Sequence, residues 1–402
     1  MSRVIALVLV ALALSAFGQP EALVLDEQAV IALVRSRSPS VLAARSRGIE
    51  ARAARVGAGA PSANPELAAS AGPRMISGVP TLDVALLLSV PLDVSGVPSR
   101  RSAAADERAL AAEAETQRVE WVVIGETLEL WVHVGVAADR LQLEERRVQL
   151  DAERLRGAKV RRAAGAVGDG DIALALVLEA EGKARREIAG AEYQALLTEL
   201  RFALGLSPEE RIAPVSVAPA ESVAELAGLL ENLQHHPALV LAKVNANAAK
   251  KETSLQHGLA VPLPRVTLTG ERSPEYVARL GFDLALPFFQ RNQTQTAVAE
   301  AREQTETLTL GLTGQRLEAE LHAAYARLSG ARAAYHDLKA ALPSIDDAEH
   351  LTSRAYELGQ ISLAQVVAIH RETAVARSAL LDAKAAALRA QIMTQLASGS
   401  RL

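Results

Sequence analysis

Residues 81–92 read TLDVALLLSVPL, and residues 276–289 read YVARLGFDLALPFF. Every second residue from Leu82 to Val90 is apolar, and so is every second residue from Tyr276 to Leu286. Because side chains along a β-strand point alternately to opposite faces, each stretch predicts a strand with one continuous apolar face. Half-buried strands of soluble proteins show this alternation, and so do the strands of about 10 residues that build membrane barrels.

Both strands follow another strand candidate across a Pro/Gly-containing loop, at residues 66–72 and residues 266–272. Two hairpins are too few to close a barrel, so a membrane barrel would need several chains. The predicted lipid-facing residues are Leu82, Val84, Leu86, Leu88, Tyr276, Leu280, Phe282 and Leu284. The opposite strand faces carry Asp83, Arg279 and Asp283, which would line the barrel lumen or pair across strands as structural ions.

The chain contains the same plan twice. Three pairs of motifs recur at offsets of 198, 196 and 194 residues: Ser38-Pro39 and His236-Pro237, Val90-Pro91 and Leu286-Pro287, Gly165 and Gly359. Nearly constant offsets indicate a tandem duplication. We therefore expect a first repeat over residues 19–207, a linker over residues 208–221 and a second repeat over residues 222–402.

Helices account for most of each predicted repeat. The expected pairs are a first helix (25–58 and 223–259), a very long helix (99–164 and 292–358) and a last helix (172–204 and 362–397). A run of about 65 residues spans roughly 100 Å, which globular domains do not need. Apolar residues spaced by seven predict helices that contact neighbours on two sides, as in a bundle or a ring.

Two further features of the long helices carry expectations. The charged residues between the apolar stripes predict a solvated face: Glu144, Glu145, Arg146, Arg147, Glu153 and Arg154. Pro343 lies inside the second long helix and predicts a kink or an interruption there.

The amino terminus has the features of an export signal. Arg3 precedes an apolar run from Val4 to Leu14, which is too short to span a bilayer. Ala16-Phe17-Gly18 offers small residues for cleavage, so residues 1–18 are predicted to be a signal peptide, with an uncleaved anchor as the alternative. No later segment predicts a transmembrane helix, which leaves a β-barrel as the way into a membrane.

Composition excludes several classes of function. The net charge of −4 offers no footprint for nucleic acid, and the absence of cysteine removes thiolate metal sites and cysteine nucleophiles. No catalytic or phosphate-binding motif is present. His235 and His236 are adjacent and would point in different directions, which favours a surface or capping role over a metal site. We predict no enzymatic activity, no cofactor and no metal site.

These features together resemble the TolC-type outer-membrane efflux proteins over essentially the whole mature chain. Leu342-Pro343 and the stretch RAYELGQISL at residues 354–363 are similar to the family's pattern through its second helical turn. The sequences VPLD at residues 90–93 and LPFF at residues 286–289 resemble its strand-exit motif. The short chain is similar to the CzcC/CusC-like heavy-metal branch, whereas Gly168 departs from the Ser, Thr or Pro usual in the first turn.

The resemblance implies a mostly α fold with a small β part, built as a homotrimer. Four strands per chain would contribute to a 12-stranded β-barrel among outer-membrane lipids. The helices would continue as an α-helical barrel into the periplasm. Its far end would meet a periplasmic adaptor (membrane fusion) protein and an inner-membrane efflux pump, so the channel would be a passive exit for solutes.

The two Gly turns would then form the periplasmic tip that docks the adaptor. The residues expected there are Gly165, Val167, Gly168, Asp169, Asp171, Gly359, Ile361, Ser362 and Gln365. Asp169 and Asp171 would ring the pore mouth and favour cations, or Asp171 would cap the next helix.

Two other functions compete with the channel. A periplasmic coiled-coil adaptor or structural protein would share the export signal and the long helices, but it should lack a hairpin inside each helical repeat. A helical periplasmic enzyme would need a catalytic constellation, which the sequence does not contain.

Overall fold

The computed structural model describes residues 22–213, 215, 217–220, 222, 224–273 and 275–400, so the predicted signal peptide lies outside the described residues. The first series of elements is α2 (Glu27–Arg37), α3 (Pro39–Ala53), β1 (Glu66–Ile76), β2 (Val79–Pro91), α4 (Val97–Ala163) and α5 (Asp169–Ala203). The second series is α6 (Leu226–Asn232), the 3-10 helix η1 (Leu233–His235), α7 (Pro237–Leu259), β3 (Arg265–Ser273), β4 (Glu275–Asp283), α8 (Gln293–Glu357) and α9 (Leu363–Ser398). The predicted fold class, mostly helical with four strands, is confirmed.

The first helix of each repeat was predicted as continuous, and this was wrong. Both are broken immediately before a proline, at Ser38 and at His236, where ψ is 125° and 128°. A residue that precedes proline is driven out of the helical region by the proline ring. Each proline instead becomes the first residue of a new helix, α3 or α7, where its missing N–H costs no hydrogen bond.

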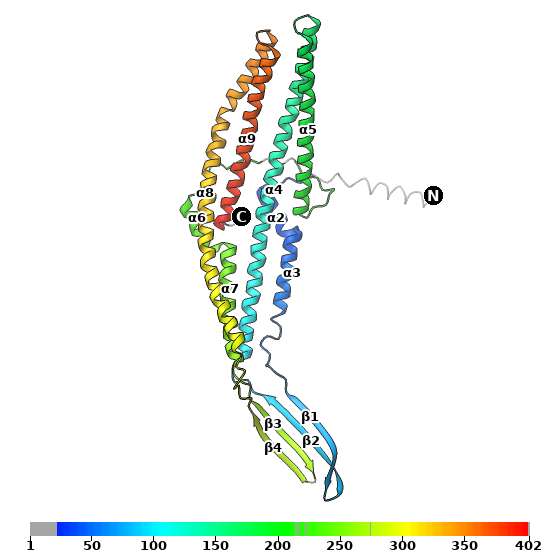
Figure 1. The fold of residues 1–402 in the computed structure, drawn as a ribbon, viewed down its shortest axis with the longest axis vertical. Coiled ribbons are helices and arrows are strands. Elements are labelled where there is room, and N and C mark those ends of the chain that lie inside the picture. Colours follow the sequence, from blue (N-terminus) through cyan, green and yellow to red (C-terminus); the bar gives the residue numbers. More distant parts are fainter. Residues whose placement is uncertain are drawn as a thin grey trace, which may run out of the picture. The chain divides into compact units, whose positions relative to one another are not determined.

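The two long helices are close to their predicted bounds, since α4 has 67 residues and α8 has 65. Pro343 does not interrupt α8, which continues through it as one helix. Each long helix turns back into a partner, α4 into α5 and α8 into α9, so that the chain forms two long helical hairpins (Figure 1).

The strands form one antiparallel sheet in the order β1-β2-β3-β4 (Figure 1). Both predicted hairpins are present, and β2 also pairs with β3, which joins the strands of the two repeats. Leu86 of β2 lies opposite Ala69 on one side and Gly270 on the other. This register places the alternate residues of all four strands on the same two faces.

The described chain divides into two compact units, and each draws on both repeats. One unit contains the sheet and comprises residues 44–118 and 237–316. The other comprises the residues up to 43, residues 119–236 and the residues from 317 onward. The large apolar core of the second unit gathers residues from α2, α4, α5, α9 and the linker, including Val30, Leu128, Leu200, Val217 and Ile392.

One described helix, α4, contains a stretch that is long and apolar enough to cross a membrane by composition alone. Half of that stretch is buried inside the structure. Ile124, Leu128 and Val132 of α4 belong to the core of the second unit and are fully buried. The apolar character of α4 therefore has an explanation in core packing, and the prediction that no helix spans the membrane stays a prediction.

Candidate channel surfaces

One face of the sheet is apolar across all four strands, except at the end of β3, where Arg272 lies over the ring of Tyr276. Pairing places Leu88 of β2 beside Leu67 of β1 and Leu268 of β3, and Leu268 beside Leu280 of β4. The predicted lipid-facing residues of β2 and β4 therefore lie on the same face, although their strands are not neighbours. Their large side chains are exposed, Leu82 to 69%, Leu280 to 78% and Phe282 to 63%. Such a contiguous exposed apolar surface marks a site of contact with membrane or protein.

The opposite face of the sheet carries the charged residues. Arg279 pairs with Glu271 across the second hairpin at 2.9 Å, and Arg74 lies 3.8 Å from Asp83 across the first. Arg74 also lies 4.0 Å from Glu271, which links the two hairpins. The predicted lumen residues Asp83 and Arg279 thus belong to one network of charges. Asp283 lies on the same face, because it stands opposite Arg265 in the register.

One predicted member of the apolar strand face is misplaced. Leu284 follows the last residue of β4, Asp283, and is not part of the sheet. The apolar alternation runs on to Leu286 in the sequence, but strand pairing ends where β3 begins at Arg265, opposite Asp283. The alternating pattern alone therefore overestimated the length of β4, because a residue belongs to the sheet only where the neighbouring strand offers a residue to pair with.

The two helical turns end their long helices in the same way. Gly165 and Gly359 have φ of 72° and 73°, which a residue with a side chain adopts only under strain. In the first turn, Ala166 N–H donates to the Arg161 carbonyl. In the second, Gln360 N–H donates to the Ala355 carbonyl. Both are the six-residue hydrogen bond of a glycine-terminated helix, so the geometry of each turn favours glycine at this position.

The helices that leave the two turns start differently. Ser362 caps α9 by accepting from the Gln365 N–H, and the Gln365 side chain accepts from the Ser362 N–H. In contrast, Gly168 is the N-cap of α5 and has no side chain to offer. The reading of Asp171 as the cap is therefore wrong, because Asp171 lies inside the first turn of α5. Asp169 lies there too and accepts from Arg162 Nε at 2.6 Å, which lowers the pKa of its carboxyl.

The two helical hairpins, α4 with α5 and α8 with α9, contact each other close to the two glycine turns. A small buried cluster there joins Leu155 of α4 and Ala175 of α5 to Tyr356 of α8 and Leu363 of α9. The guanidinium of Arg161 stacks 4.6 Å from the centre of the Tyr356 ring and donates to the Tyr356 carbonyl at 2.8 Å. One arginine of α4 therefore ties the first hairpin to the end of α8 by two contacts.

The two adjacent histidines differ, since His235 is exposed as expected and His236 is buried. His236 is 8% exposed, and its ring packs edge-on against Trp121 at 6.1 Å between centroids. A side chain at position 399 would come within 2.8 Å of the His236 backbone, and Gly399 has φ of 69°. His236 is thus a buried packing residue rather than a surface one. No group of three or more His, Asp or Glu residues within the described residues could hold a metal ion.

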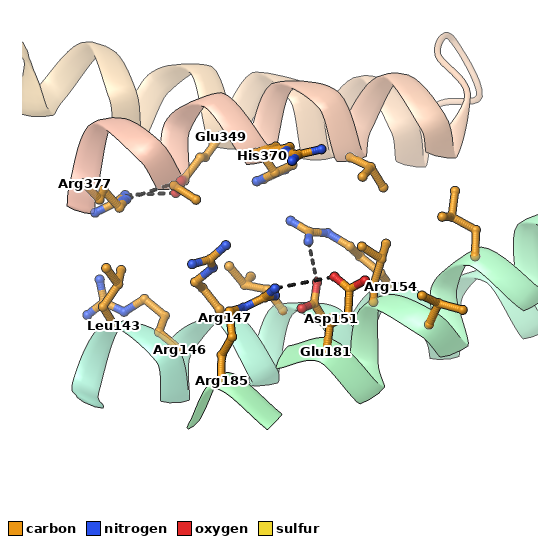
Figure 2. A pocket seen from close by; sticks show the side chains of 17 residues that line it. Leu143, Arg146, Arg147, Asp151, Arg154, Glu181, Arg185, Glu349, His370 and Arg377 are labelled. Carbon is orange, nitrogen blue, oxygen red and sulfur yellow. Dashed lines mark hydrogen bonds and ion pairs between the residues drawn. The ribbon is translucent and has the colours of Figure 1, made fainter. Parts of the chain in front are cut away.

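A cavity of 420 Å³ separates the two hairpins further along the same unit (Figure 2). Its charged and polar lining comes from all four helices: Arg146, Arg147, Asp151, Arg154, Glu181, Arg185, Glu349, His370, Arg371 and Arg377. The predicted solvated face is therefore wrong for Arg147 and Arg154, which point into this cavity, and for Glu144, which is 9% exposed. Glu145, Arg146 and Glu153 are exposed as predicted.

Sequence analysis did not find this cavity or the contact between Arg161 and Tyr356. Both depend on which side of α4 faces the second hairpin, and a seven-residue spacing alone does not give that orientation. A partial signal was present, because α4 carries Arg146, Arg147 and Arg154 close to one another, and α9 carries Arg371 and Arg377.

No protein-family model matches the chain. Over 300 residues the chain is 25% identical to the cobalt-zinc-cadmium resistance protein CzcC of Cupriavidus metallidurans, an alignment that covers 72% of this chain and 71% of that protein. A structure of CusC, described in terms of transmembrane channel formation, matches 93% of this chain and 92% of its own at 18% identity, with a TM-score of 0.79. The outer membrane protein VceC from Vibrio cholerae matches with a TM-score of 0.76, at 18% identity over 93% and 96% of the two chains.

These comparisons show that the chain shares its fold with solved outer-membrane channel proteins. The chain has the fold of those channels, and the predicted TolC-type resemblance is confirmed at the level of the fold. The relative found by sequence is a metal-resistance protein, in line with the predicted similarity to the CzcC/CusC-like branch.

Proposed function

We propose that this chain is one subunit of a homotrimeric outer-membrane channel that gives solutes a passive exit from the cell. The observation that carries the proposal is the four-stranded sheet with one apolar face and one charged face. Within the described residues, the outer edges of β1 and β4 pair with no further strand. Unpaired strand edges cannot be left in a bilayer, so β1 of one subunit would pair with β4 of the next.

Three sheets of this kind would close a barrel of twelve strands. The apolar face would contact outer-membrane lipid and the charged face, with Asp83, Arg279 and Asp283, would line a water-filled lumen. In barrels of this type the lipid side is apolar and the interior polar. The same arrangement explains why the ion pairs that cross strands all lie on one face.

The helical hairpins would extend into the periplasm, where an adaptor protein and an inner-membrane pump would meet the two glycine turns. Asp169, which is exposed, and Asp171, which is half-buried, both lie in the first turn of α5 and would each occur three times around the pore mouth in a trimer. A ring of carboxylates favours cations over anions in a constriction. The name of the relative CzcC points to divalent transition-metal cations as the cargo, and such a ring would suit them.

The chain would contribute a conduit and no chemistry of its own. The alternative, a periplasmic adaptor without a membrane barrel, leaves the exposed apolar face of the sheet without a partner. The two proteins would fractionate differently. The channel would remain with the outer membrane until detergent is added, whereas an adaptor without a barrel would not be held in the outer membrane.

The proposal is tested by purifying the mature protein in detergent, measuring its mass by light scattering and recording its conductance in planar bilayers. We expect a trimer that conducts, with cation selectivity that falls when Asp169 and Asp171 are both changed to Asn. The matched control changes Glu145 and Glu153, which are exposed on α4 and lie outside the turn. A soluble monomer without conductance would refute the channel, and equal effects of both double variants would remove the turn from the pore mouth.

A further inference from the structure

The cavity between the two hairpins has more guanidinium groups than carboxylates to pair with them. Six arginines line it, against the three carboxylates of Asp151, Glu181 and Glu349. Two more carboxylates, those of Glu144 and Asp346, contact lining arginines without lining the cavity themselves. The set therefore contains six positive charges and five negative ones.

Each of these carboxylates is already engaged. Asp151 accepts from Arg154 at 2.7 Å, and Glu349 accepts from Arg377 at 2.9 Å. Glu144 accepts from Arg147 at 2.9 Å, while Glu181 lies 3.4 Å from Arg185. Figure 2 shows the pair of Glu349 and Arg377, on α8 and α9, facing the arginines of α4 and α5 across the cavity. The remaining two arginines, Arg146 on α4 and Arg371 on α9, form no ion pair with any residue that the structure describes.

A neutral hydrogen-bonding group lies in the same lining. His370 of α9 is 9% exposed, and its Nε2 atom has no hydrogen-bond partner among the described residues. Burial, together with the charge of Arg154, lowers the pKa of His370 to about 4, so the ring is neutral near pH 7. A buried polar atom without a partner is rare and costly, which indicates that something absent from the protein chain completes this site.

We propose that this cavity binds a small tetrahedral oxyanion, of the phosphate or sulfate class, that bridges the two helical hairpins. Arg146, Arg371 and His370 would supply the donors that the ion pairs leave over. Guanidinium groups match the oxygens of such anions and form strong charge-assisted hydrogen bonds with them. The volume of 420 Å³ lies in the range of small-molecule sites and leaves space for the anion with bound water.

The oxyanion would act as a structural bridge rather than as cargo. Without it, Arg146 of α4 and Arg371 of α9, which are both exposed, have no carboxylate partner among the described residues. With it, α4 and α9 would share an acceptor. The inference concerns a site within the helical unit, and it does not depend on whether the sheet forms a membrane channel.

The test uses the full-length mature protein in detergent and inorganic sulfate as the probe, titrated by calorimetry against chloride at equal ionic strength. The cavity variant combines Arg146→Gln with Arg371→Gln, which leaves every ion pair of the lining intact. The control variant combines Arg156→Gln with Arg186→Gln, which removes two arginines of α4 and α5 that do not line the cavity. Both variants change the net charge equally.

We expect saturable sulfate binding by the wild type and the control, and affinity weaker by about tenfold or more in the cavity variant, since charge-assisted hydrogen bonds are lost. Sulfate should also raise the thermal midpoint of the wild type above its value in chloride, but not that of the cavity variant. Equal weakening in both variants would show a general charge effect and overturn the site. Absence of sulfate binding by the wild type would also overturn it, as expected if a neighbouring subunit fills the cavity with its own carboxylate.

Discussion

Leu86 and Leu87 offer a matched test of the two sheet faces, because they are identical neighbours on one strand. Leu86 lies on the apolar face, opposite Ala69 and Gly270. Leu87 lies on the charged face, opposite Thr269 on the neighbouring strand. We predict that Leu86→Arg prevents assembly in the outer membrane, whereas Leu87→Arg is tolerated because its guanidinium reaches the aqueous interior.

The magnitude follows from the depth of the residue in the sheet. Leu86 stands in the middle of β2, which runs from Val79 to Pro91, so it would lie near the bilayer midplane. An arginine on the lipid face at that depth costs about 2–4 kcal/mol per subunit. Since about 1.4 kcal/mol corresponds to a tenfold change in an equilibrium constant, even the lower figure predicts a loss of about 30-fold for each subunit, and a trimer contains three.

The assay is the amount of detergent-resistant trimer recovered from outer membranes, compared between the two variants expressed at equal levels. Circular dichroism of each purified variant checks that the helical part still forms. Equal recovery of trimer from both variants would refute the assignment of the faces, and a greater loss for Leu87→Arg would reverse it.

The remaining predictions concern the helical unit. Gly359→Ala should destabilise the α8/α9 hairpin by about 1–2 kcal/mol because φ is 73° there, whereas Gly157→Ala should stabilise α4 by about 0.5–1 kcal/mol. Hydrogen exchange measures both effects, and a stabilised Gly359 variant would contradict the turn geometry. His370 has its pKa lowered to about 4, so the unfolded chain binds its proton first as the pH falls. The free energy of unfolding that depends on a neutral His370, about 3 kcal/mol, is fully present above pH 6.5 and is lost as the pH falls from 6.5 to 4. Thermal unfolding should therefore depend more steeply on pH in the wild type than in His370→Gln.

The sequence predicted the β part of the fold well because a strand pattern has a period of two and leaves little freedom. Once Leu86 and Phe282 each lie on an apolar face, antiparallel pairing through β3 places them on the same side. The strand ends were less predictable, as Leu284 shows. Where pairing stops is decided by the partner strand, which begins at Arg265, directly after Pro264.

The helical part was predicted in its lengths but less well in its contacts. The breaks at Ser38 and His236 could be predicted from the sequence, since each residue precedes a proline and is driven out of the helical region. The charged side of α4 was assigned to solvent because mixed charges between apolar stripes normally are solvated. In a pair of hairpins, that side faces a second hairpin, and Arg147 and Arg154 are only 29% and 16% exposed in their side chains as a result.

The departure of the first turn from the family pattern, at Gly168, has a physical consequence that distinguishes the two turns. The second turn is followed by a helix that Ser362 and Gln365 cap with short, local hydrogen bonds. The first is followed by α5, whose start has only charge to stabilise it: two acidic residues in its first turn, and the pair of Asp169 with Arg162 reaching back from α4.

Exposed charge interactions are screened by salt, with a Debye length of about 10 Å at 0.1 M and about 3 Å at 1 M, whereas a local hydrogen-bonded cap is not. Asp169 is 84% exposed in its side chain, so its pairing should be fully open to this screening. We therefore predict that raising sodium chloride from 0.1 M to 1 M speeds amide hydrogen exchange in the first turn of α5 and leaves the first turn of α9 unchanged. Gly168→Ser should remove the difference, because serine supplies the missing cap. If the first turns of α5 and α9 respond equally to salt, charge does not stabilise the start of α5, and the ion pair between Arg162 and Asp169 contributes nothing to its stability.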